Sequence, residues 1–125
     1  MKKIISTSLA PAAIGPYSQA TEVNGTLYIS GQIPINPASG KIEATDISSQ
    51  TEQVFKNIKA ILDEAGYSFA DVVKTTVFIA DMAQFPDVNE VYKKYYTNDS
   101  PARSTIAVKG LPLGALVEIE TIAVK

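Results

Sequence analysis

The 125-residue chain contains no cysteine and no histidine. Without cysteine there is no disulfide, no thiolate nucleophile and no Cys-ligated zinc. Without histidine the chain lacks the commonest metal ligand and the side chain that ordinarily titrates near neutral pH. A Ser-His-Asp triad and a zinc hydrolase built on imidazole are therefore excluded. Any catalysis must use carboxylates, Arg, Lys, Tyr, hydroxyls, amides or the backbone, and no metal site is expected.

The chain also has no excess of positive charge and no long apolar run. Its 11 Lys and Arg residues stand against 13 Asp and Glu residues, which gives a net charge of −2. Nucleic-acid-binding proteins usually concentrate basic charge to neutralise phosphates, so a nucleic-acid partner is not expected. The apolar stretch after Lys2 and Lys3 is too short for a signal peptide or a membrane helix. We therefore expect a cytoplasmic protein without a membrane partner.

The composition that is present is that of an ordinary globular protein. Hydrophobic residues make up 46% of the chain and charged residues 19%. No internal repeat or low-complexity segment is visible, and this length supports a single hydrophobic core. The sequence predicts one domain over residues 1–125.

Local patterns predict an α+β domain. Asn24-Gly25 between β-prone residues predicts a hairpin over residues 22–30. Helical periodicity predicts an amphipathic helix over 46–65, capped by Asp46 or Ser48 and ended by Gly66. A second helix follows Pro86. The remaining predicted strands are residues 72–79, about 104–108 and about 116–124. This order predicts a mixed sheet with both helices on one face.

The face of the sheet without helices is predicted to be partly apolar. The last strand, residues 116–124, is apolar on both alternations except at Glu118 and Glu120. An exposed apolar sheet face usually packs against other subunits. We therefore expect a homo-oligomer with sites between its subunits.

Arg103, Glu118 and Glu120 are the strongest candidates for chemistry. Arg103 is the only arginine and precedes a predicted strand, on which it shares a face with Thr105. A guanidinium binds a carboxylate through two parallel hydrogen bonds, although a lone Arg is more often part of a salt bridge. Glu118 and Glu120 share a strand face, where they either pair with a cation and hold water or simply extend into solvent.

Four other residues are weaker candidates. Tyr17 follows Gly15-Pro16 and could line a pocket, although packing is the commoner role at such a position. Ser30 and Gly31 end a predicted strand, where glycine permits close approach of a ligand or merely serves a turn. Asn89 lies beside the apolar stripe of the second helix and is either a contact or an exposed amide.

Several motifs together resemble the Rid (YjgF-like) family. The resemblance covers nearly the whole chain, in order and at matching spacing. The most specific stretch runs from Pro-Ala-Arg-Ser to Glu-Ile-Glu. The motifs are Gly15-Pro16-Tyr17-Ser18-Gln19-Ala20, Ser30-Gly31-Gln32-Ile33-Pro34, Thr76-Val77-Phe78-Ile79-Ala80-Asp81-Met82, Asn89-Glu90-Val91-Tyr92, Pro101-Ala102-Arg103-Ser104 and Glu118-Ile119-Glu120.

The resemblance implies a chorismate-mutase-like α+β fold and a homotrimer with clefts between subunits. It also implies hydrolysis of 2-enamino or 2-imino acids to 2-keto acids and ammonia, without a cofactor. By the same resemblance, Arg103 binds the substrate carboxylate and Glu118 orients or activates water. Tyr17, Ser30, Gly31, Asn89 and Thr105 line the cleft. Thr105 stands where many members carry Cys, so the side chain at this position offers a hydroxyl and not a thiol.

Two other functions are alternatives to the deaminase. The same clefts would serve a regulatory module that binds 2-keto acids, and an endoribonuclease activity is disfavoured by the acidic balance and missing histidine. If the last two strands form a hairpin about Pro112, Arg103 would face Thr121 and not Glu118. Their cooperation would then depend on side-chain reach or on the contact between subunits.

Overall fold

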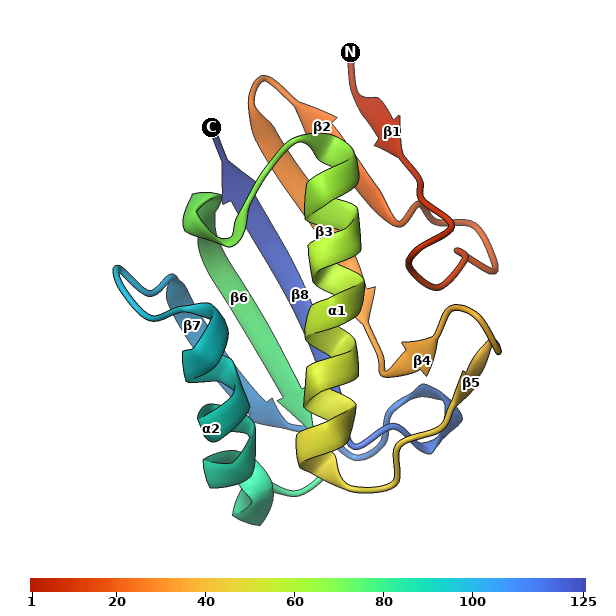
Figure 1. Cartoon of the computed structure of the whole chain (residues 1–125), viewed down its shortest axis with the longest axis vertical. Helices are drawn as coiled ribbons and strands as arrows, with labels where there is room; N and C mark the ends of the chain where they lie inside the picture. The colour runs from red at the N-terminus through yellow and green to blue at the C-terminus, as the bar shows by residue number, and fades with distance from the viewer.

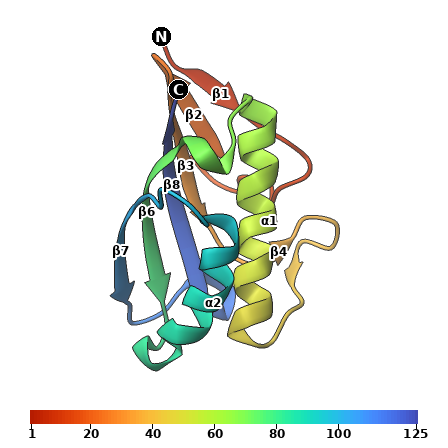
Figure 2. The same ribbon diagram turned by 60° about the vertical axis from the view of Figure 1, so that its left-hand side comes forward.

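The computed structural model describes all residues from Met1 to Lys125. A six-stranded sheet in the order β1-β2-β3-β8-β6-β7 forms one layer, and a two-stranded ribbon, β4-β5, lies apart from it. Both helices pack on one face of the large sheet (Figures 1 and 2). The elements are β1 (Lys3–Ile5), β2 (Ala20–Val23), β3 (Thr26–Gln32), β4 (Ile35–Asn36), β5 (Lys41–Ile42), α1 (Ile47–Ala65), β6 (Val72–Ile79), α2 (Phe85–Tyr95), β7 (Ala102–Ala107) and β8 (Val117–Val124), with short 3-10 turns at Phe69–Asp71, Met82–Gln84 and Pro112–Gly114.

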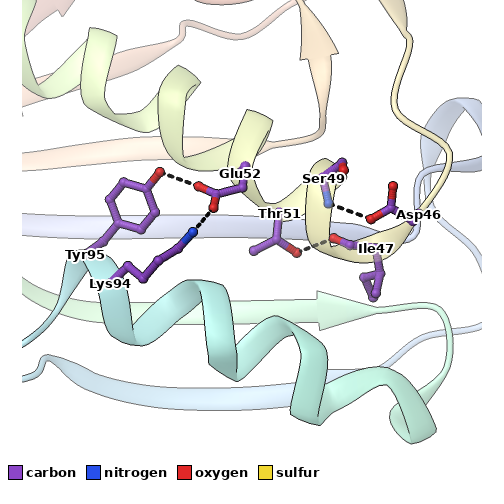
Figure 3. Close-up of polar contacts among 7 residues, drawn as sticks. All are labelled: Asp46, Ile47, Ser49, Thr51, Glu52, Lys94 and Tyr95. Atoms are coloured by element: carbon purple, nitrogen blue, oxygen red, sulfur yellow. Dashed lines mark hydrogen bonds and ion pairs between the residues drawn. The ribbon is translucent and has the colours of Figure 1, made fainter.

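Helix α1 begins and ends where the sequence predicts. The Asp46 carboxylate accepts a hydrogen bond from the Ser49 backbone N–H at 3.0 Å, which caps the first turn (Figure 3). Gly66 ends the helix in the left-handed conformation, with φ 80°. The buried face packs on the sheet and forms the centre of the core. Its apolar residues are Ile47, Val54, Phe55, Ile58, Ile61 and Leu62.

Helix α2 packs against both the sheet and α1. The Tyr95 hydroxyl donates a hydrogen bond of 2.6 Å to Glu52 of α1, which also pairs with Lys94 (Figure 3). The Tyr95 ring stacks on Phe55 with centroids 4.3 Å apart. These contacts fix α2 relative to the sheet, and so they fix the position of Asn89 in its middle turn.

The predicted hairpin is present as β2 and β3. Asn24 and Gly25 both have positive φ, 49° and 77°, as a tight two-residue turn between twisted strands requires. The predicted strand over residues 72–79 is also present, between two other strands of the sheet. Strand β1, which has three residues, was not predicted.

The conditional hairpin of the last two strands is wrong. Strand β7 pairs only with β6, in parallel, and β8 pairs antiparallel with β3 and β6. The cause is the β6-α2-β7 crossover, which returns the chain parallel to β6 and leaves β7 at the sheet edge. Thr75 of β6 pairs with both Arg103 and Thr121, so those two residues are level with each other but one strand apart.

The face of the sheet opposite the helices is uncovered in the single chain and carries both apolar and acidic side chains. Tyr28, Ile106 and Val124 are each exposed over 42–47% of their surface. Glu118 and Glu120 alternate on the same strand with the core residues Ile119 and Thr121. No helix is both long and apolar enough to span a bilayer.

Candidate active site

Four of the predicted site residues line one cleft, which we call the first cleft. Tyr17, Ser30, Gly31 and Glu118 border a cavity of about 490 Å³. Two loops complete its wall, the one before β2 and the one before β8. The other residues that line it are Pro11, Ala12, Ile14, Gln19, Gln32, Ile33, Ile35, Pro112 and Leu113.

A β-bulge at Ser30 and Gly31 shapes this cleft. Ile29 pairs with Thr121 and Gln32 pairs with Ile119, so three steps on β3 oppose two steps on β8. The extra residue breaks the ladder beside Glu118. A Cβ placed on Gly31 would overlap the Glu118 carboxylate and lie 2.9 Å from its Cδ. The carboxylate therefore rests against the bare backbone of Gly31, which only glycine permits.

The Glu118 carboxyl is half-buried on the floor of the first cleft. Burial raises its pKa, and the nearby Glu120 carboxylate raises the pKa further. Glu120 itself is exposed and lies outside the first cleft. The pattern that placed both residues on one strand face is confirmed, and burial distinguishes them. A carboxyl group with a raised pKa exchanges protons closer to neutral pH.

Ser30 and Tyr17 differ in how they are held. The Ser30 hydroxyl donates a 2.7 Å hydrogen bond to the Ser18 carbonyl, so its proton is engaged while its oxygen can still accept. The Tyr17 side chain is exposed over 54% of its surface. Its phenol group is therefore available to a ligand or to another subunit.

Arg103 and Asn89 meet in a second cleft, on the face that carries the helices. Arg103 Nη1 donates to Asn89 Oδ1 at 2.7 Å, and both residues line a cavity of about 450 Å³. The guanidinium lies over the rings of Tyr92 and Phe85, with its Cζ 4.7 Å and 5.0 Å from their centroids. The remaining N–H groups keep their planar fork for a carboxylate.

Two residues of this arrangement were not assigned to the site from sequence. In the sequence, Tyr92 belongs to the motif Asn89-Glu90-Val91-Tyr92 without an assigned role, and Phe85 lies outside every motif. The Tyr92 ring supports Arg103 while its hydroxyl bonds Thr75 at 2.7 Å, and burial raises its pKa. The available signal was the helical spacing, because Phe85, Asn89 and Tyr92 follow each other at four and three residues.

Thr105 lies two residues beyond Arg103 on the same face of β7. Its Oγ1 is buried and has no hydrogen-bond partner in the chain. The predicted alternation of Arg103 and Thr105 is supported by the register, since they pair with Thr75 and Val77, both core residues. An unpaired buried hydroxyl is unusual. Thr105 is not among the residues that line the first or the second cleft of the single chain.

The two clefts lie on opposite faces of the sheet. Arg103 is in register with Thr75, whose side chain contacts α2, so Arg103 lies on the face that carries the helices. Glu118 is in register with Phe78. The neighbours of Phe78, Val77 and Ile79, face the core, so Phe78 and Glu118 lie on the other face. The structure therefore groups Arg103 with Asn89, and Glu118 with Tyr17, Ser30 and Gly31, but it does not bring the two groups together in one chain. No cluster of three or more His, Cys, Asp or Glu side chains is arranged to hold a metal ion.

Comparison with known proteins identifies the family. The family model described as Endoribonuclease L-PSP matches residues 7–125. A solved structure of a conserved Rid protein family member, YyfA from Yersinia pestis, superposes with a TM-score of 0.96, is 52% identical and covers 100% of both chains. The chain belongs to the Rid family. The resemblance read from the motifs is thus confirmed, as is the α+β fold with a mixed sheet and two helices.

Relatives of this Rid protein carry different functional names. The 2-iminobutanoate/2-iminopropanoate deaminase of Mus musculus is 50% identical over 125 residues, which is 100% of this chain and 93% of the mouse protein. A Lactococcus lactis relative named as a regulator, AldR, is 54% identical over 121 residues, 97% of this chain and 96% of its own.

Proposed function

We propose that this Rid protein hydrolyses 2-imino acids to 2-keto acids and ammonia, in sites completed between the subunits of a homotrimer. The observation that carries the proposal is the pair of half-sites: a preoriented guanidinium in one cleft and a half-buried carboxyl with a raised pKa in the other. The full-length similarity to a relative named as a deaminase supports it.

Arg103 binds the substrate carboxylate in this proposal. Its guanidinium donates a hydrogen bond to Asn89 and lies over the rings of Phe85 and Tyr92. Fixing the guanidinium before binding lowers the entropy lost when the complex forms. The substrate is thereby held in one orientation relative to water, which makes the attack effectively intramolecular.

Glu118 handles the protons of the reaction. Water adds to the iminium carbon and gives one proton to Glu118, which leaves a carbinolamine. The Glu118 carboxyl returns that proton to the nitrogen. The C–N bond then breaks to release ammonia, and the hydroxyl proton passes to the Glu118 carboxylate as the C=O bond forms. The C=N bond is replaced by C=O, and one water is consumed for each ammonia released. Neither an oxidant nor a cofactor is required by this balance. Ser30, whose own proton is engaged, accepts a hydrogen bond from the positively charged iminium nitrogen.

The complete site requires two chains, since the two half-sites lie on opposite faces of one sheet. The uncovered face, with its exposed Tyr28, Ile106 and Val124, provides an apolar surface for assembly. Because each subunit offers one half-site of each kind, head-to-tail contacts that close into a ring would complete every site. A trimer is the ring that the family resemblance implies.

A coupled assay tests the proposed function. A serine or threonine dehydratase generates the imino acid, and 2-keto acid is followed with and without this protein. We expect faster keto-acid release with the wild type and at least ~100-fold less acceleration with Arg103→Ala. Lys109→Ala removes another exposed cation of the same segment and serves as the matched control. Full activity of Arg103→Ala in an intact oligomer would rule out its assigned role.

The regulatory alternative uses the same two half-sites. The relative named as a regulator favours considering it, because a 2-keto acid carries the same carboxylate that Arg103 would bind. Binding of 2-ketobutyrate by the wild type, without any acceleration of imine hydrolysis, is the result that would favour it. We do not propose ribonuclease activity, since the chain has no histidine and a net charge of −2.

A further inference from the structure

Two apolar side chains beside the first cleft are exposed, and nothing in the chain covers them. Ile14 is exposed over 86% of its surface and Leu113 over 71%, and both line the cavity above Glu118. They come from different loops, Ile14 from the segment before β2 and Leu113 from the segment before β8. Isolated exposed apolar residues are ordinary, but two that line the same concave site indicate a ligand contact.

The backbone at Leu113 is held in a conformation that leucine rarely adopts. Its φ and ψ are 57° and 23°, in the left-handed region between Pro112 and Gly114. A branched apolar residue is strained in this region. Burial does not offset this strain within the chain, because the side chain is exposed. Strain of this kind at a cavity is typical of a functional position.

The loop that carries Ile14 is anchored by one buried amide. Gln19 is only 4% exposed, and its Oε1 accepts from the Thr7 N–H at 2.7 Å. Its Nε2 donates to the carbonyls of Thr7, Ala10 and Pro11 at 3.0, 3.3 and 2.8 Å. One side chain therefore fixes the path of residues 7–11 just before Ile14. Losing it would leave three carbonyls and one N–H to find water instead.

We propose that Ile14 and Leu113 are specificity-determining residues that bind an aliphatic side chain of the substrate, and that Gln19 is the positioning residue for Ile14. The proposal rests on the proposed function for the identity of the site, and it adds which part of the substrate this cleft recognises. Part of the remaining wall fits the same chemistry, because Ile33, Ile35 and Pro112 are apolar. No cationic side chain lines this cleft, so an acidic substrate side chain finds no partner there.

Affinities for 2-keto acids test the proposal independently of turnover. Pyruvate and 4-methyl-2-oxopentanoate share the keto-carboxylate group and differ only in the side chain, a methyl against an isobutyl group. We expect the wild type to bind the larger acid roughly 10-fold more tightly by calorimetry. Leu113→Asn keeps a residue that tolerates the left-handed region but removes the apolar contact. This variant and Ile14→Ser should each lower the preference by about 3-fold or more while leaving pyruvate affinity unchanged.

Leu9→Ser is the matched control for these variants. Leu9 is as exposed as Leu113 and belongs to the same loop as Ile14, but it does not line the cleft. Its substitution should leave the preference unchanged. An unchanged preference in both cleft variants would overturn the proposal, as would equal weakening of both keto acids. A change of oligomeric state with the preference intact would assign the two side chains to a subunit contact instead.

Gln19→Met tests the positioning role, because methionine keeps the length and removes every hydrogen bond of the amide. We expect KM for the leucine-derived imino acid to rise about 3- to 10-fold with kcat unchanged, and KM for 2-iminopropanoate to stay constant. A merely structural role would lower the active fraction and reduce kcat for both substrates equally, which would contradict the assignment. If the wild type binds keto acids with the expected preference but accelerates no hydrolysis, the proposed function fails and this inference stands. If the wild type accelerates hydrolysis but shows no preference between the two keto acids, this inference fails and the proposed function stands.

Discussion

Arg103 and Glu118 lie on opposite faces of one sheet, and strand β6 separates the two strands that carry them. Arg103 faces α2, where Asn89 holds its guanidinium, whereas Glu118 lies on the uncovered face against Gly31. Neither side chain can reach the other through a packed sheet. A reaction that uses both must therefore take Arg103 from one subunit and Glu118 from another.

Mixing two inactive variants tests this arrangement. Arg103→Ala and Glu118→Gln should each be inactive alone, because each lacks one half of every site. Random assembly of equal amounts of the two should restore about a quarter of wild-type activity, since one site in four receives both intact halves. Co-expression with different affinity tags and keto-acid release measure the effect. If both residues act within one chain, the mixed oligomers will be as inactive as the separate variants.

Gly31→Ala should inactivate the protein without unfolding it. The added Cβ would overlap the Glu118 carboxylate, which moves away at little cost because it ends a flexible side chain. We expect kcat to fall ~100-fold or more, as for loss of a general acid–base group. Gly110→Ala is the control, since a Cβ there meets nothing within 4 Å. Wild-type kcat in Gly31→Ala would show that the position of the carboxylate is not important.

Glu120→Gln should shift the acidic limb of the pH–rate profile to lower pH. Burial, and then the Glu120 charge, raises the pKa of Glu118, so removing that charge lets the pKa fall. If ionised Glu118 takes the proton from water, activity is then kept to lower pH. The profile of kcat/KM measures this shift. Glu64→Gln removes an equal charge at the exposed end of α1 and should leave the limb in place.

The raised pKa of Glu118 also predicts how the stability of the folded protein depends on pH. Because the folded pKa of Glu118 lies above the unfolded value, the folded state binds the proton more tightly. Its contribution to stability is present at low pH and is lost as the pH rises through the folded pKa. Glu120→Gln should reduce that loss, so chemical denaturation at neutral pH should show a variant at least as stable as the wild type.

Two substitutions of Tyr92 separate its two contacts. Tyr92→Phe keeps the ring under Arg103 but leaves the buried Thr75 hydroxyl without a partner, which lowers stability by about 1–3 kcal/mol with KM unchanged. Tyr92→Leu also removes the cation–π contact, and KM should rise about 3- to 10-fold. Equal KM values for the two variants would mean that the ring does not support the guanidinium.

The sequence predicted best those features that neighbouring residues determine. Helix α1 has its cap at Asp46 and its end at Gly66, because both signals act within one turn of the chain. The hairpin at Asn24 and Gly25 depends only on two left-handed residues. Strand pairing was less predictable, since placing β6 between β7 and β8 results from a crossover that local alternation does not encode.

In the candidate site, too, the sequence predicted individual residues better than the contacts between them. The motifs identified Arg103, Asn89 and Glu118 individually, but not that the first two would be bonded or that the third would rest on Gly31. Helical spacing could place Phe85 near Asn89, and a motif contains Gln19, but neither signal gives the contact. A ring under a guanidinium and an amide among carbonyls are defined by the tertiary fold.

The bulge at Ser30 and Gly31 fixes how long the chain can be at this point. Before it, odd-numbered residues such as Leu27 and Ile29 face the core; after it, Gln32 does. Removing one residue would restore simple alternation with Gln32 still facing the core, but it would also remove the extra residue at which the ladder is broken beside Glu118. Insertions and deletions should therefore be tolerated in the surface turn at 37–40 but not here. In homologues, the number of residues between the hairpin and Gln32 should therefore be constant.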